Sequence, residues 1–205
     1  MKKYIVEFIG TFFLVLTVCM AGSKAGDFAP LAIGFVLMIM VYAGGYVSGA
    51  HYNPAVSLAM CIRRKLGLGD MFVYWLVQIG GGIVAVLVAQ YVFEYSGLPH
   101  DPLGKKAIVA EALGTFALAY VVLNVATSAK TAGNSYYGMA IGLTITAMAY
   151  TLGPVSGGAF NPAVAISNSL FGGFNWNELW IYIAGSLIGA VAAAGIYLLL
   201  KPDEE

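Results

Sequence analysis

Two asparagines are the residues whose type and setting most clearly suggest chemistry. They begin the matching tripeptides Asn53-Pro54-Ala55 and Asn161-Pro162-Ala163, which lie 108 residues apart inside longer similar stretches. An Asn side chain can cap a helix, and Pro suits the first helical position, so each tripeptide predicts the start of a helix. An amide also offers donor hydrogens to a passing water or hydroxyl group. The chemistry predicted here is hydrogen bonding to a solute, with no bond broken.

Two carboxylates and one imidazole are further candidates. Glu7 and Glu111 fall well inside apolar stretches, where a charge costs about 2.5–3.5 kcal/mol, so both should face inward and find partners. One hypothesis is a proton relay, and the other is that each Glu braces the backbone of a loop carrying an Asn-Pro-Ala tripeptide. We favour bracing. His51 is interpreted as a hydrogen-bonded loop residue that helps to aim carbonyl groups, in preference to a titrating gate.

The other reactive side chains do not form a catalytic set. His51 and His100 are the only histidines, and no carboxylate pair lies near either in sequence. Cys19 and Cys61 are far apart and are expected to be unpaired thiols. The sequence therefore predicts no enzyme activity, no cofactor and no metal site.

The composition indicates which solvent surrounds these residues. The chain has 205 residues, of which 60% are hydrophobic and 10% charged, and its mean hydropathy is +0.83. A soluble domain has about 25% charged residues, so the expected environment is a lipid bilayer. The zero net charge, with no basic cluster longer than residues 63–65, gives no support to a nucleic-acid partner.

Six apolar segments have roughly the length of ~20 residues that crosses a bilayer as a helix. They are residues 4–22, 30–48, 71–95, 107–127, 135–152 and 178–200. The first also resembles a cleavable signal peptide, but Glu7 and its length favour a membrane span. No linker is long enough to separate two soluble domains, so we expect a single membrane domain over residues 1–205.

Two further segments are too short to span. Residues 54–62 and 162–171 are apolar, but about ten residues at ~1.5 Å each cover only half a bilayer. A half-span returns to the side it came from, and its irregular arm is tolerated where it lines a cavity. We therefore expect a water-accessible passage.

The sequence repeats itself beyond these stretches. A Glu-x-x-Gly-Thr-Phe pattern begins at both Glu7 and Glu111, and Tyr74 matches Tyr182. Each half, about 4–96 and 107–200, then holds three spans and one half-span. An odd number of crossings inverts the second half. The two half-spans should meet near mid-membrane, where their N-terminal dipoles disfavour cations.

Positive charges indicate the orientation. With the N-terminus in the cytoplasm, seven of the ten Lys and Arg residues fall inside, and only Lys24, Lys105 and Lys106 fall outside. Both termini are therefore predicted to be cytoplasmic, in a cell (plasma or inner) membrane.

The paired motifs, over residues 4–200, resemble those of the aquaporin and aquaglyceroporin family, the major intrinsic proteins. The resemblance implies an all-α membrane protein with six transmembrane helices, two re-entrant half-helices and an inverted repeat. It also implies a pore in every subunit of a homotetramer. Loop bracing by Glu7 and Glu111 is what the family implies as well.

The family's selectivity filter is assigned to four positions near the outer mouth. Counted from the two asparagines, they fall on Ile33, Ala149, Gly158 and Val164. The fourth position is usually Arg, so Val164 is a departure, although some plant vacuolar members resemble this chain in having Val there. A compensating residue from the loop around His100 is an open alternative.

These side chains predict a wide, apolar filter without a fixed charge. The expected function is a passive channel for water and/or small uncharged solutes, with ammonia, urea and glycerol as candidates. The alternative is a secondary transporter of a small solute, because inverted repeats and broken helices occur there as well. A transporter normally carries ionisable or ion-coordinating residues along its pathway, and the expected pore has none beyond the glutamates.

Overall fold

Each of the six long apolar segments forms one helix in the computed structural model, which describes residues 1–97 and 104–200. All six are long and apolar enough to cross a membrane. The helices are α1 (Lys2–Lys24), α2 (Ala29–Ser48), α4 (Leu68–Phe93), α5 (Lys105–Thr127), α6 (Tyr137–Ser156) and α8 (Leu179–Leu200). Short 3₁₀ turns lie in three connections: η1 (Gly26–Phe28), η2 (Ala129–Thr131) and η3 (Trp176–Glu178).

Helix α6 ends later than the sequence predicts. The Gly153-Pro154 pair suggests an end near residue 152, but the helix continues to Ser156. Pro154 lies in the last turn, so its missing N–H removes only one hydrogen bond from the end of the helix. Gly157 then closes the helix in the left-handed conformation, and its N–H donates to the Gly153 carbonyl oxygen.

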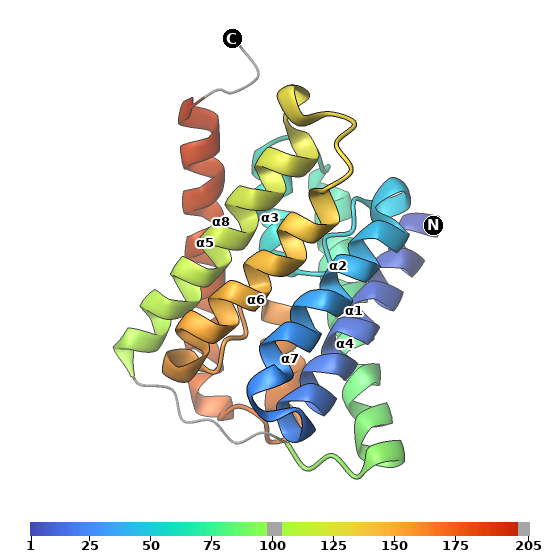
Figure 1. Cartoon of the computed structure of the whole chain (residues 1–205), viewed down its shortest axis with the longest axis vertical. Coiled ribbons are helices and arrows are strands. Elements are labelled where there is room, and N and C mark those ends of the chain that lie inside the picture. The colour runs from blue at the N-terminus through green and yellow to red at the C-terminus, as the bar shows by residue number, and fades with distance from the viewer. Residues whose placement is uncertain (98–103, 201–205) are drawn as a thin grey trace.

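Two half-helices complete the fold. They are α3 (Pro54–Ile62) and α7 (Pro162–Ser169), and α7 stops two residues before its predicted end. Both contact α4 and α8, and they touch each other. In Figure 1, α3 lies in the upper half of the bundle and α7 in the lower half, as expected for half-helices that enter from opposite faces.

The two halves of the chain pack by the same rule. Helix α1 lies against α4, and α5 lies against α8 in the same way. A Cβ added to Gly81 would collide with the Phe8 carbonyl, and one added to Gly189 would collide with the Ala112 carbonyl. Small residues allow such close backbone approach in membranes. The predicted fold class is confirmed: an all-α membrane protein with six spans and two re-entrant half-helices in inverted halves.

The start of α1 is tied to the start of α4. Lys3 forms a 2.6 Å ion pair with Asp70, and the Tyr4 hydroxyl donates to the same carboxylate. Figure 1 shows the start of α1 and the end of α8 toward the same end of the bundle. An even number of spans produces this arrangement.

Candidate functional site

Both asparagines cap a half-helix. The Oδ1 of Asn53 accepts the N–H of Ala55 at 2.8 Å, and Asn161 accepts the N–H of Ala163 at 2.9 Å. Each Asn has an extended backbone and is followed by Pro at the first helical position. These are the contacts expected of an Asn N-cap, and they satisfy one exposed helix N–H at each half-helix.

The remaining amide groups link the two half-helices. Nδ2 of Asn53 donates to the Phe160 carbonyl oxygen at 2.9 Å, and Nδ2 of Asn161 donates to the Tyr52 carbonyl oxygen at 2.8 Å. Each acceptor directly precedes the other asparagine in the chain. One hydrogen of each NH₂ group is therefore used by the opposite loop, and the second has no acceptor among the described residues.

The two loops have unusual backbone conformations. Tyr52 and Phe160 have positive φ angles of 50° and 46°. This backbone region costs a bulky residue free energy, and a residue stays in it only where the surrounding structure holds it there. Their rings lie over Gly10 and Gly114, where an added Cβ would collide with them. The Gly of each Glu-x-x-Gly-Thr-Phe segment thus makes room for the aromatic residue before Asn.

Glu7 is fully buried and accepts four hydrogen bonds. Two come from the backbone N–H groups of His51 and Tyr52, at 2.9 and 2.7 Å. The others come from the side chains of Ser48 and Gln78, at 2.7 and 2.8 Å. The carboxylate therefore holds the loop before Asn53 against α4.

Glu111 repeats this arrangement with one bond fewer. It accepts from the Ser156 hydroxyl at 2.7 Å and from the N–H groups of Ala159 and Phe160 at 3.0 and 2.6 Å. The position equivalent to Gln78 is Ser186, whose shorter side chain is buried without a partner among the described residues. The second loop is thus held to its glutamate by fewer hydrogen bonds than the first loop.

His51 is buried in the first loop. Its Nδ1 lies 3.1 Å from the Ser57 hydroxyl, and its ring packs edge-on against Tyr74 at 5.2 Å between centroids. The Ser57 hydroxyl also accepts from Gln78 at 3.1 Å. His51 therefore belongs to the polar network that includes Glu7.

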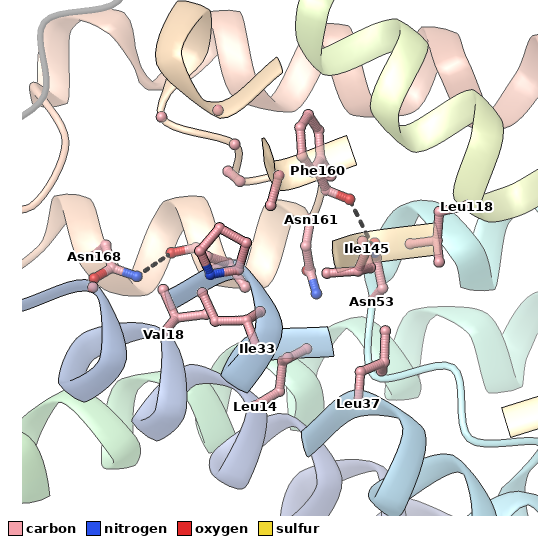
Figure 2. A pocket seen from close by; sticks show the side chains of 18 of the residues that line it. Leu14, Val18, Ile33, Leu37, Asn53, Leu118, Ile145, Phe160, Asn161 and Asn168 are labelled. Atoms are coloured by element: carbon pink, nitrogen blue, oxygen red, sulfur yellow. Dashed lines mark hydrogen bonds between the residues drawn. The ribbon is translucent and has the colours of Figure 1, made fainter. Parts of the chain in front are cut away.

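A cavity of about 320 Å³ runs past both asparagines. Its lining includes all four positions assigned to the filter, Ile33, Ala149, Gly158 and Val164. The polar side chains among the described lining residues are His51, Asn53, Asn161 and Asn168. None of these carries a fixed charge, and Glu7 and Glu111 do not line the cavity. Figure 2 shows Asn53 and Asn161 in the middle of the lining, with Asn168 at one side.

Asn168 is a lining residue that the sequence reasoning missed. It follows Val164 by four residues on α7, so the two share a helix face. The signal in the sequence is a polar residue one helical turn beyond Val164, the filter position that departs from the family's usual Arg. The loop around His100 lies outside the described residues. Within residues 1–97 and 104–200, no group of three His, Cys, Asp or Glu side chains could hold a metal ion.

Known proteins share both the sequence pattern and the architecture. The family model described as "Major intrinsic protein" matches residues 1–197. The chain is 36% identical to glycerol uptake facilitator protein-like 6 of Lactiplantibacillus plantarum, with 95% of each chain covered. It is also 36% identical to aquaporin NIP1-1 of Zea mays, over 98% of this chain and 75% of that one. The solved aquaglyceroporin from Plasmodium falciparum matches with a TM-score of 0.76 at 21% identity, over 95% of both chains, which shows a common fold.

Proposed function

This chain belongs to the major intrinsic protein family, and we propose that it is a passive channel whose Arg-less filter admits small uncharged solutes beside water. The family consists of channels for water and small solutes and not of enzymes. The pore lies within each subunit. One continuous membrane domain, residues 1–205, forms it from inverted repeats at about 4–96 and 107–200.

The observation that carries the proposal is the lining of the cavity. Asn53 and Asn161 lie in it with spare amide hydrogens, and the described lining has no Asp, Glu, Lys or Arg. A neutral solute can replace its water shell with these donors, whereas an ion loses far more hydration than they return. The positive ends of α3 and α7 add a field that opposes cations.

The filter is assigned to Ile33, Ala149, Gly158 and Val164, all of which border the cavity. Because none of the four has a polar side chain, the constriction would be wider and less polar than one that contains Arg. This composition supports glycerol, urea or ammonia as cargo. The similarity to a protein named as a glycerol uptake facilitator supports the same choice.

The buried contacts of the glutamates favour a channel over a secondary transporter. The carboxylate oxygens of Glu7 and Glu111 accept hydrogen bonds from loop N–H groups and hydroxyls, and neither residue borders the cavity. A coupled transporter normally has ionisable or ion-coordinating residues along its pathway. Bracing of the loops is therefore the role we assign to both, with His51 as part of the first brace.

The protein is an integral membrane protein. We place its termini in the cytoplasm and the protein in the plasma or inner membrane, from the distribution of its Lys and Arg residues. The exposed apolar faces of the spans suit lipid and neighbouring subunits, and we assign the family's homotetramer.

Flux into liposomes tests the function. Purified protein should speed osmotic shrinkage linearly with the osmotic gradient, without saturation and without a proton or ion gradient. Swelling after glycerol or urea entry, in the same preparation, measures solute flux. Saturable flux that requires an ion gradient would replace the channel by the transporter.

A further inference from the structure

We propose that Asn168 determines solute specificity in this pore, by supplying one neutral hydrogen-bond donor beside a constriction that Val164 leaves without a polar side chain. The inference rests on the proposed channel function. It concerns which solutes pass, and not whether a pore exists.

Asn168 occupies the right place for such a role. It lies one helical turn, ~6 Å, beyond Val164 along α7, and it borders the cavity, with Gly173 close to its side chain. Only 3% of its surface is exposed. Figure 2 shows the amide of Asn168 at the edge of the lining, on the same side as Val18.

The surrounding residues fix the orientation of the amide. Its Oδ1 accepts from the Tyr95 hydroxyl at 3.1 Å and from the Cys19 thiol at 3.7 Å. Because two donors face the oxygen, the NH₂ group is turned toward Val164, and it donates to the Val164 carbonyl oxygen at 3.0 Å. A fixed donor needs no reorganisation when a solute arrives.

The amide has a donor hydrogen to spare. An NH₂ group carries two hydrogens, and among the described residues Nδ2 of Asn168 has one acceptor, the Val164 carbonyl. The second hydrogen is available to a solute in the cavity. No other Asn, and no Gln, Ser or Thr side chain, borders the described lining besides Asn53 and Asn161 at the helix caps.

This donor exists in one half of the pore alone. The residue equivalent to Asn168 in the first half-helix is Met60, 108 residues earlier, which packs in the apolar core. The repeat therefore does not demand a polar residue here. The amide is an addition on the side of the proposed filter.

The solute class follows from the chemistry of a single neutral donor. A solute as wide as the lumen loses its water shell and must take hydrogen bonds from the wall, while water molecules in file keep bonds to each other. Solutes with a carbonyl or hydroxyl acceptor, such as urea and small polyols, gain from Asn168. Water gains less.

The test compares solute and water flux of Asn168→Leu, a substitution of similar size without a donor. We expect urea and glycerol flux in liposomes to fall about 3- to 10-fold, the range for one hydrogen bond, and water flux to fall less than about 2-fold. The matched control is Asn124→Leu, because Asn124 also donates to the carbonyl four residues before it, that of Tyr120, and does not border the cavity. The control should leave the solute-to-water ratio unchanged.

A second variant tests the positioning of the amide. Tyr95→Phe removes one donor from Oδ1 and should lower the solute-to-water ratio in the same direction by a smaller factor. If Asn168→Leu fails to fold because the Tyr95 hydroxyl is stranded, the double variant Tyr95→Phe with Asn168→Leu removes that cause and is measured in its place.

The outcomes separate this inference from the proposed function. Wild-type liposomes that conduct neither water nor solutes would overturn the channel itself. A conducting wild type with an unchanged solute-to-water ratio in Asn168→Leu, or in its double variant, would overturn the role of Asn168 alone. Equal loss of water and solute flux would also overturn it, because that result reports a damaged pore.

Discussion

The side-chain amide of Asn53 donates to the main-chain carbonyl oxygen of Phe160 at 2.9 Å, although 107 residues separate them in sequence. With the reciprocal bond from Asn161 to Tyr52, each half-helix cap holds the loop of the other half. The two Asn-Pro-Ala tripeptides are thus one interlocked unit whose asparagines line the cavity.

Loss of one cap should therefore affect both loops. Asn53→Ala removes the acceptor for the Ala55 N–H and the donor to the buried Phe160 carbonyl. We expect a loss of about 0.5–2 kcal/mol for the cap and about 1–3 kcal/mol for the stranded carbonyl. Thermal unfolding in detergent measures the change. Asn175→Ala is the control, because Asn175 caps only the exposed η3 turn, and its midpoint should barely move.

The two buried glutamates should differ in their response to amide substitution. Glu7→Gln replaces the charged acceptor of four hydrogen bonds, and its NH₂ opposes one fixed backbone N–H, because the Ser48 hydroxyl and the Gln78 amide can turn to accept. Glu111→Gln also opposes one backbone N–H but replaces the charged acceptor of three hydrogen bonds. Because a hydrogen bond to a charged group contributes about 1–1.5 kcal/mol more than a neutral one, Glu7→Gln should unfold at the lower temperature.

Asp70→Asn is the control for this pair. The ion pair of Asp70 with Lys3 is about one-third exposed on both sides, and exposed pairs contribute at most ~1 kcal/mol. Equal midpoints for Glu7→Gln and Glu111→Gln would show that Gln78 does not contribute to the first brace.

Two glycines should tolerate no methyl group. Gly10→Ala and Gly114→Ala would drive a Cβ into the Tyr52 and Phe160 rings. We expect each to cost about 1–3 kcal/mol through overpacking and to lower water flux, because these rings precede the two asparagines. Gly195→Ala is the control: nothing lies within 4 Å of its added Cβ. Within α8 it should stabilise the protein by about 0.5–1 kcal/mol, and thermal unfolding with liposome flux gives both readouts.

Size and charge at the proposed filter can be separated at Val164. Val164→Leu adds bulk alone, while Val164→Arg adds bulk, charge and donors in the lining. Both should lower glycerol and urea flux relative to water, whereas the flux of methylammonium, a cation probe, should stay at background in the wild type and in both variants, because the uncharged lining and the helix dipoles already oppose cations. The liposome assay reports each ratio. Unchanged solute flux in both variants would remove residue 164 from the constriction.

Much of the fold could be predicted because a chain that crosses a membrane must contain long apolar segments. Runs of ~20 apolar residues are needed to cross hydrocarbon, so the spans could be read from their length. The Asn-Pro pairs predict the starts of α3 and α7, because helix capping and proline geometry depend only on neighbouring residues. The end of α6 was misplaced at residue 152, since a Pro in a last turn is tolerated where a mid-helix Pro is not.

The contacts between distant segments could not be predicted in the same way. Sequence reasoning expected Glu7 to find partners but did not identify Gln78, and it overlooked Asn168 altogether. Both residues are 0–3% exposed, and their roles depend on which side chains of α1, α4 and α7 face one another. Helical rotation and packing depth decide that.

The sequence by itself determined that this chain is an inverted-repeat membrane protein with two capped half-helices, because hydropathy, repeat and cap are each encoded in neighbouring residues. The tertiary structure alone decided how the halves interlock, with Asn53 bound to Phe160 and Asn161 bound to Tyr52. It also decided that the Asn168 amide, held by Tyr95, lies beside Val164. The physical reason is range: helix formation follows local rules, whereas a buried hydrogen bond needs two groups that only the packed bundle brings together.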